Sequence, residues 1–65
     1  MKITLNGEPR EVTSANLTKT LEELGFGAAK VATAVNGAFV PVAARETAQL
    51  AEGDQLEVLA PMQGG

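Results

Sequence analysis

The chain has 65 residues, of which 45% are hydrophobic, and its formal net charge is −3. This length allows one small domain with one modest core, and scattered lysines and arginines in an acidic chain argue against nucleic acid and membrane surfaces as partners. Cysteine and histidine are both absent, which excludes disulfides, cysteine nucleophiles, histidine acid–base chemistry and the usual zinc or iron–sulfur ligands, so we expect no metal site.

The first expected element is a β-hairpin. Residues 2–6 alternate between hydrophobic and polar side chains, and Asn6-Gly7 is a pair typical of tight turns. Pro9 favours a slightly longer loop, because proline is unusual so close to the start of a paired strand. We therefore expect the second strand over residues 10–13, with Val12 facing the core.

A short amphipathic helix is expected next. Leu17, Leu21 and Leu24 are spaced by four and three residues, which places them on one face of a helix. Asn16 is a suitable N-cap, and Gly25 stands where a left-handed residue closes a helix. These leucines are interpreted as core residues.

Further strands are expected after the helix. Residues 30–36 favour a strand that ends at Asn36-Gly37, and the chain continues as a strand through Phe39 and Val40. Pro41 then argues for a sheet edge or a bulge. The following stretch, residues 43–49, has no readable pattern.

The last expected strand covers residues 55–60, after a turn at residues 52–54. Alternation along this strand places Leu56 and Val58 toward the helix and turns Leu59 outward. The order of hairpin, helix and further strands predicts an α+β domain with the β-grasp, or ubiquitin-like, architecture. In this architecture a mixed sheet of four to five strands carries one helix across one face.

A short tail is expected to follow the domain. Residues 1–60 form the predicted β-grasp domain, and residues 61–65 form a flexible tail, because Pro61 ends the strand and glycine has a high ordering cost. The tail consists of Pro61, Met62, Gln63, Gly64 and Gly65. Leu59, with Pro61 and Met62, is expected to form a small hydrophobic patch for a partner at the base of this tail, the alternative being incidental exposure.

Gly64-Gly65 is the feature that points to chemistry. A glycine end has no Cβ and fits a narrow channel in a second protein, where its carboxylate attacks the α-phosphate of ATP and displaces pyrophosphate. A sulfur donor then converts the acyl-adenylate to a thiocarboxylate. Because the chain offers no nucleophile–base pair, the stabilising charges belong to the partner. The sequence therefore predicts a sulfur carrier rather than an enzyme.

The whole chain also resembles the sulfur-carrier family of thiamine biosynthesis. The resemblance rests on Ile3-Thr4-Leu5-Asn6-Gly7-Glu8, Val35-Asn36-Gly37, Phe39-Val40-Pro41, Leu50-Ala51-Glu52-Gly53-Asp54 and Val58-Leu59-Ala60-Pro61-Met62-Gln63-Gly64-Gly65. It implies that Gly65 is adenylated by a ubiquitin-activating-like adenylyltransferase that uses ATP, and then receives sulfur from a donor enzyme. It further implies delivery to thiazole synthase, with no cofactor bound to the carrier itself. Separately, the sequence shows no apolar run of membrane-spanning length and no signal-peptide pattern at its start, so we expect a cytoplasmic protein.

Three other functions remain open at this point. The small subunit of molybdopterin synthase shares the fold and the reactive end, although its tail typically has a proline pair and aromatic residues. A ubiquitin-like protein modifier also ends in Gly-Gly. A β-grasp interaction module, from a different class, would use neither glycine, so that one residue added after Gly65 would leave it unaffected.

Overall fold

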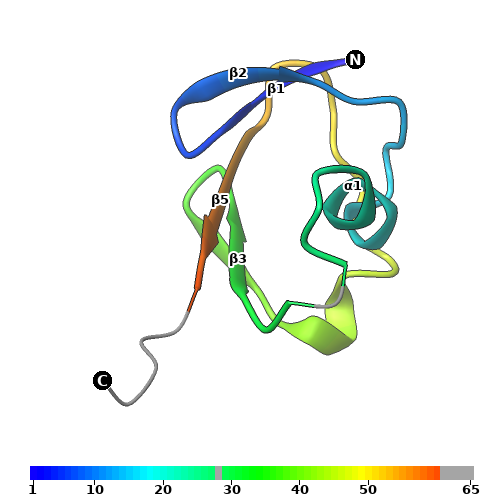
Figure 1. Ribbon diagram of the computed structural model, residues 1–65, viewed down its shortest axis with the longest axis vertical. Helices are drawn as coiled ribbons and strands as arrows, with labels where there is room; N and C mark the ends of the chain where they lie inside the picture. Colours follow the sequence, from blue (N-terminus) through cyan, green and yellow to red (C-terminus); the bar gives the residue numbers. More distant parts are fainter. Residues whose placement is uncertain (28, 61–65) are drawn as a thin grey trace.

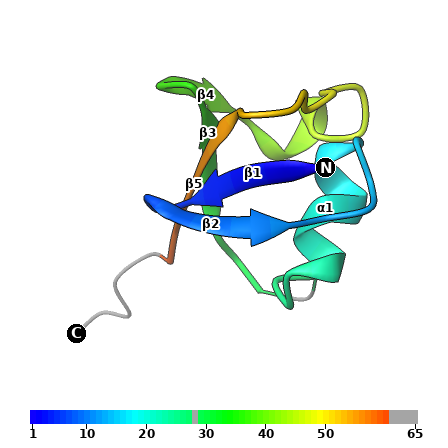
Figure 2. The same cartoon turned by 90° about the horizontal axis from the view of Figure 1, so that it is seen from above.

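The chain folds as a mixed sheet with a helix on one face. A computed structural model describes residues 1–27 and 29–60, and within them the sheet has five strands in the order β2-β1-β5-β3-β4. Helix α1 lies across one face of this sheet, and the opposite face is left open by the described residues (Figures 1 and 2). The elements are β1 (Lys2–Leu5), β2 (Glu8–Glu11), α1 (Leu17–Glu23), β3 (Ala32–Val35), β4 (Ala38–Val40), the 3₁₀ helix η1 (Val42–Ala44) and β5 (Gln55–Leu59). The predicted β-grasp architecture is confirmed.

The β1–β2 hairpin is tighter than the sequence suggested. Asn6 and Gly7 have φ values of 51° and 87°, as a two-residue type I′ turn requires, and β2 begins directly after them. The longer loop expected from Pro9 is therefore wrong. Pro9 lies opposite Thr4, at a position where the backbone nitrogen of β2 faces the open edge, so its missing N–H removes no bond to β1. Val12 is fully buried, as expected.

Helix α1 has the predicted ends. The Asn16 side chain accepts a hydrogen bond from the backbone N–H of Lys19, and Gly25 adopts a φ of 95° just after the helix. The N–H groups of Gly25 and Phe26 donate to the carbonyls of Glu22 and Leu21, which is the bonding pattern of a Schellman motif.

The stretch of residues 43–49, for which the sequence predicts no element, contains the end of η1 and leads toward β5. It is held by long-range bonds to the start of the helix: Leu17 N–H donates to Ala48 O at 3.0 Å, and Leu50 N–H donates to Ala15 O at 2.7 Å. The Asn16 side chain also donates to the carbonyl of Glu46. Because these hydrogen-bond partners are distant in sequence, the local pattern of hydrophobic residues does not predict the conformation of this stretch.

The core lies between α1 and the inner face of the sheet. Its hydrophobic residues are Ile3, Leu5, Val12, Leu17, Leu21, Leu50, Leu56 and Val58. Two buried threonines were not foreseen, and each hydroxyl donates to a carbonyl: Thr20 to Ser14 at 2.9 Å, and Thr33 to Val40 at 2.8 Å. Their burial is therefore compensated by hydrogen bonding.

Candidate functional site at the end of the last strand

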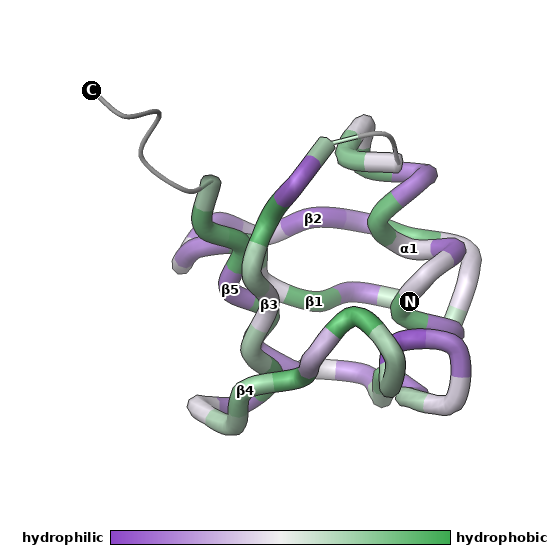
Figure 3. The backbone as a smooth tube through the Cα atoms, turned by 90° about the horizontal axis from the view of Figure 1, so that it is seen from below, coloured by the Kyte–Doolittle hydropathy of each residue, from purple (hydrophilic) through white to green (hydrophobic). Residues whose placement is uncertain are grey.

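The predicted reactive end follows β5, the central strand of the sheet. On this strand Leu56 and Val58 are buried under α1, whereas Leu59 is 68% exposed, as the alternation predicts. Strand β5 alternates between polar and hydrophobic residues, and its end is hydrophobic (Figure 3). The tail residues with predicted roles, Pro61, Met62, Gln63, Gly64 and Gly65, lie outside the described residues.

The two asparagines of the type I′ turns hold β5 at opposite ends. At its C-terminal end, Asn6 accepts a hydrogen bond from Val58 N–H at 2.9 Å and donates one to Val58 O at 3.1 Å. At its N-terminal end, Asn36 accepts from Gln55 N–H at 2.9 Å and donates to Asp54 at 3.0 Å. Both asparagines are turn residues in the sequence analysis, and their side-chain contacts depend on the sheet order.

A hydrophobic surface surrounds Leu59 on the open face of the sheet. Pairing places Ala32 opposite Leu59, and Ala34 between Phe39 and Glu57. These residues line a shallow hollow of about 130 Å³. We call Ala32, Ala34, Phe39 and Leu59 the outer-face patch.

Phe39 is the member of the patch that the sequence analysis missed. The sequence predicts a strand at Phe39 but no role for it, and it predicts a patch that contains Pro61 and Met62, which lie outside the described residues. Phe39 is 68% exposed. The Asn36-Gly37 turn fixes the register of β3 and β4 and so pairs Phe39 with Ala34, which is the part that the sequence could indicate. That Phe39 shares the face of Leu59 depends on the pairing of β3 with β5.

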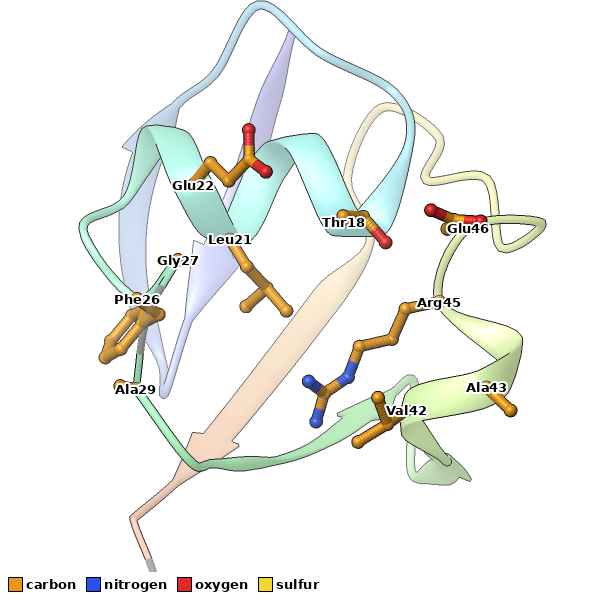
Figure 4. A pocket seen from close by; sticks show the side chains of 10 residues that line it. All are labelled: Thr18, Leu21, Glu22, Phe26, Gly27, Ala29, Val42, Ala43, Arg45 and Glu46. Atoms are coloured by element: carbon orange, nitrogen blue, oxygen red, sulfur yellow. The ribbon is translucent and has the colours of Figure 1, made fainter.

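Two wider hollows lie on the other side of β3, next to η1. One of about 390 Å³ lies between α1 and η1, and the Arg45 side chain points into it (Figure 4). Phe26, Gly27 and Ala29 also line this hollow. The guanidinium of Arg45 donates to Thr33 Oγ1 at 3.2 Å and to the carbonyl of Val31. Arg45 thereby joins η1 to β3, which is a structural role.

A carboxylate with a lowered pKa lies at the start of β5. Hydrogen bonds from the Asn36 side chain and from Ala51 N–H lower the pKa of Asp54, at the far end of β5 from Leu59. Within residues 1–27 and 29–60, no group of three or more acidic side chains is placed to hold a metal ion. No helix in this part of the chain is long and apolar enough to cross a membrane.

Comparisons with known proteins agree on one family. The sequence matches the ThiS family over residues 3–65. It is 42% identical over 62 residues to the sulfur carrier protein ThiS of Thermus thermophilus, covering 94% of this chain and 95% of the relative. The crystal structure of the thiamine biosynthesis protein ThiS from Geobacter metallireducens superposes with a TM-score of 0.85 at 33% identity, over the full length of both chains. The chain therefore belongs to the ThiS family and is a sulfur carrier of thiamine biosynthesis, not an enzyme.

Proposed function

We propose that the carboxylate of Gly65, as the C-terminal residue, carries the sulfur. A partner adenylyltransferase of the ubiquitin-activating type consumes ATP to form the Gly65 acyl-adenylate, releasing pyrophosphate. A sulfur donor then replaces AMP, leaving a thiocarboxylate. The observation that carries this proposal is the family match extending to residue 65, in a chain that ends in Gly64-Gly65.

The second half of the cycle delivers the sulfur to thiazole synthase in the cytoplasm. No group of acidic side chains among the described residues is placed to hold a metal ion. In this proposal the charges that stabilise each reacting group belong to the partner enzymes. We propose that it binds no cofactor, because ATP is used in the partner's active site.

The outer-face patch is the proposed docking surface for these partners. It lies beside the last described residues, and its two large members, Phe39 and Leu59, are both 68% exposed. A partner of matching chemistry presents a hydrophobic surface with a basic side chain placed near Glu57, which lines the same hollow.

Intact-mass measurement tests the reaction at Gly65. After incubation with the cognate activating enzyme, ATP and a sulfur source, we expect a gain of about 16 Da, as sulfur replaces one carboxylate oxygen. Fragmentation then places the added mass on the C-terminal residue. An unchanged mass, with an activating enzyme proven competent on another carrier, would contradict the proposal.

A matched control separates a carrier from an interaction module of the same fold. Adding one alanine after Gly65 leaves residues 1–60 unchanged. The terminal carboxylate then belongs to alanine, and the Gly65 carbonyl becomes part of a peptide bond. We expect this variant to bind the activating enzyme with an affinity within about threefold of the parent chain, because the docking surface is unchanged. Sulfur transfer, in contrast, is lost. A variant that still supports thiazole formation would favour the interaction module.

A further inference from the structure

Asn6 and Asn36 form a matched pair on one strand. Each is the first residue of an Asn-Gly turn, each has a φ of 51°, and each bonds β5 through its side-chain amide. They differ in which end of β5 they hold. Asn36 holds the start at Gln55, whereas Asn6 holds Val58, next to Leu59.

The Asn6 side chain continues the hydrogen bonding between β1 and β5 beyond the last residue of β1. Strand β1 ends at Leu5, and the Asn6 backbone N–H makes the next bond to β5, to Leu56 O at 2.9 Å. Val58 then turns both its N–H and its C=O toward the β1 side, where β1 has no further residue to offer. The Asn6 side chain supplies the donor and the acceptor that Val58 needs.

Asn6 therefore determines how far β5 stays attached on its β1 side. Without this amide, two partly buried backbone groups of Val58 lose their partner among the described residues, and the end of β5 is held only by β3. The ends of strands open locally at the lowest free-energy cost in a sheet. Removing such bonds lowers this cost further, so the strand end opens more often. The positions of Leu59 and Ala60 then become less well defined relative to Phe39.

We propose that Asn6 is a positioning residue for the reactive end: it fixes where the chain leaves the sheet relative to the outer-face patch. This inference rests on the proposed function of Gly65. Once the patch is docked, the fraction of time that the carboxylate spends in the partner's active site depends on how well the point where the chain leaves the sheet is fixed relative to the patch. Asn6 fixes this point by holding Val58.

The test compares Asn6→Gly with Asn36→Gly. Glycine accepts the positive φ of both turns, so both variants keep their hairpins, and both lose the side-chain amide. Amide hydrogen exchange checks the local effect. We expect protection of Val58 N–H to fall by about tenfold or more in Asn6→Gly, and that of Gln55 N–H to fall in Asn36→Gly.

Steady-state kinetics of Gly65 adenylation then show whether the position matters. For Asn6→Gly we expect kcat to fall about tenfold because productive placement is rarer, and KM to change less than kcat because the Phe39 side of the docking patch is untouched. Asn36→Gly, carrying the same loss at the other end of β5, keeps the parent kcat. Should Asn6→Gly fail to fold, Asn6→Asp retains the acceptor for Val58 N–H and is expected to show an intermediate kcat.

The outcomes separate the two proposals. Parent-like kcat in Asn6→Gly, with Val58 exchange accelerated, would overturn the positioning role and leave the sulfur carrier function standing. An equal fall in kcat for both glycine variants would also overturn it, since loss of stability alone would explain the result. A parent chain that is never modified would overturn the proposed function itself.

Discussion

Leu59 and Val42 have nearly the same exposed fraction, 68% and 70%, but different surroundings. Leu59 borders Ala32 and Phe39 on the open face of the sheet, whereas Val42 belongs to η1 and lines the hollows on the other side of β3. An exposed leucine is common on protein surfaces, so its neighbours decide whether it forms a docking site.

Leu59→Asp is expected to weaken docking to the activating enzyme without unfolding the domain. Placing a charge in a hydrophobic contact raises KM by about tenfold or more, with little change in kcat. Val42→Asp, the control of equal exposure, keeps the parent KM. Thermal unfolding of both variants checks the fold, and loss of the folded state in Leu59→Asp would contradict the exposed placement.

At the level of elements, two turns that are distant in sequence are joined by one asparagine. Asn36, in the β3–β4 turn, donates to Asp54, which also accepts from Ala51 N–H at 2.8 Å and so closes the turn before β5. Both bonds favour the ionised carboxylate and lower its pKa in the folded state. The stabilisation is therefore complete above the unfolded-state pKa and is lost as pH falls through the folded one.

Asp54→Asn should reveal this dependence. The parent chain is expected to be more stable than the variant at pH 7, and the difference in unfolding free energy should narrow as pH falls below about 4, the ordinary aspartate pKa. Urea denaturation at several pH values measures it. A difference that stays constant down to pH values of about 2 would show that ionisation of Asp54 makes no contribution.

Local signals in the sequence were enough to predict α1 and β5. The leucine spacing with Asn16 and Gly25 defines the helix, and alternation on β5 gives the outward face of Leu59. The longer loop predicted from Pro9 is wrong because a proline is tolerated in an edge strand when its nitrogen faces away from the neighbouring strand. The sequence alone does not show which way that nitrogen faces. The Asn6–Val58 contact and the place of Phe39 in the patch follow from sheet order and register, which no short window of sequence contains.

For the molecule as a whole, the small core leaves little reserve of stability. A 65-residue domain is expected to unfold with a free energy of about 3 to 10 kcal/mol. Leu17 is fully buried at the first turn of α1. Its backbone N–H also donates a hydrogen bond to the carbonyl of Ala48, in the stretch of residues 43–49.

Leu17→Ala is therefore expected to remove about 2 to 5 kcal/mol, through lost burial and the cavity left behind. Leu59→Ala makes the same change at an exposed position and should cost about 0.5 kcal/mol or less. Chemical denaturation measures both. Equal losses in the two variants would contradict the arrangement of the core.

The two outer strands of the sheet are protected unequally. Strand β2 presents Glu8, Pro9 and Glu11 at its edge, while β4 is only three residues long and carries the exposed Phe39. An open-ended fibre built by edge pairing would need both edge strands to accept a neighbour, and β2 lacks the N–H of Pro9 at its edge. Pairing of β4 with β4 of a second copy would therefore stop at two copies, because β2 is a poor edge for continuing the sheet.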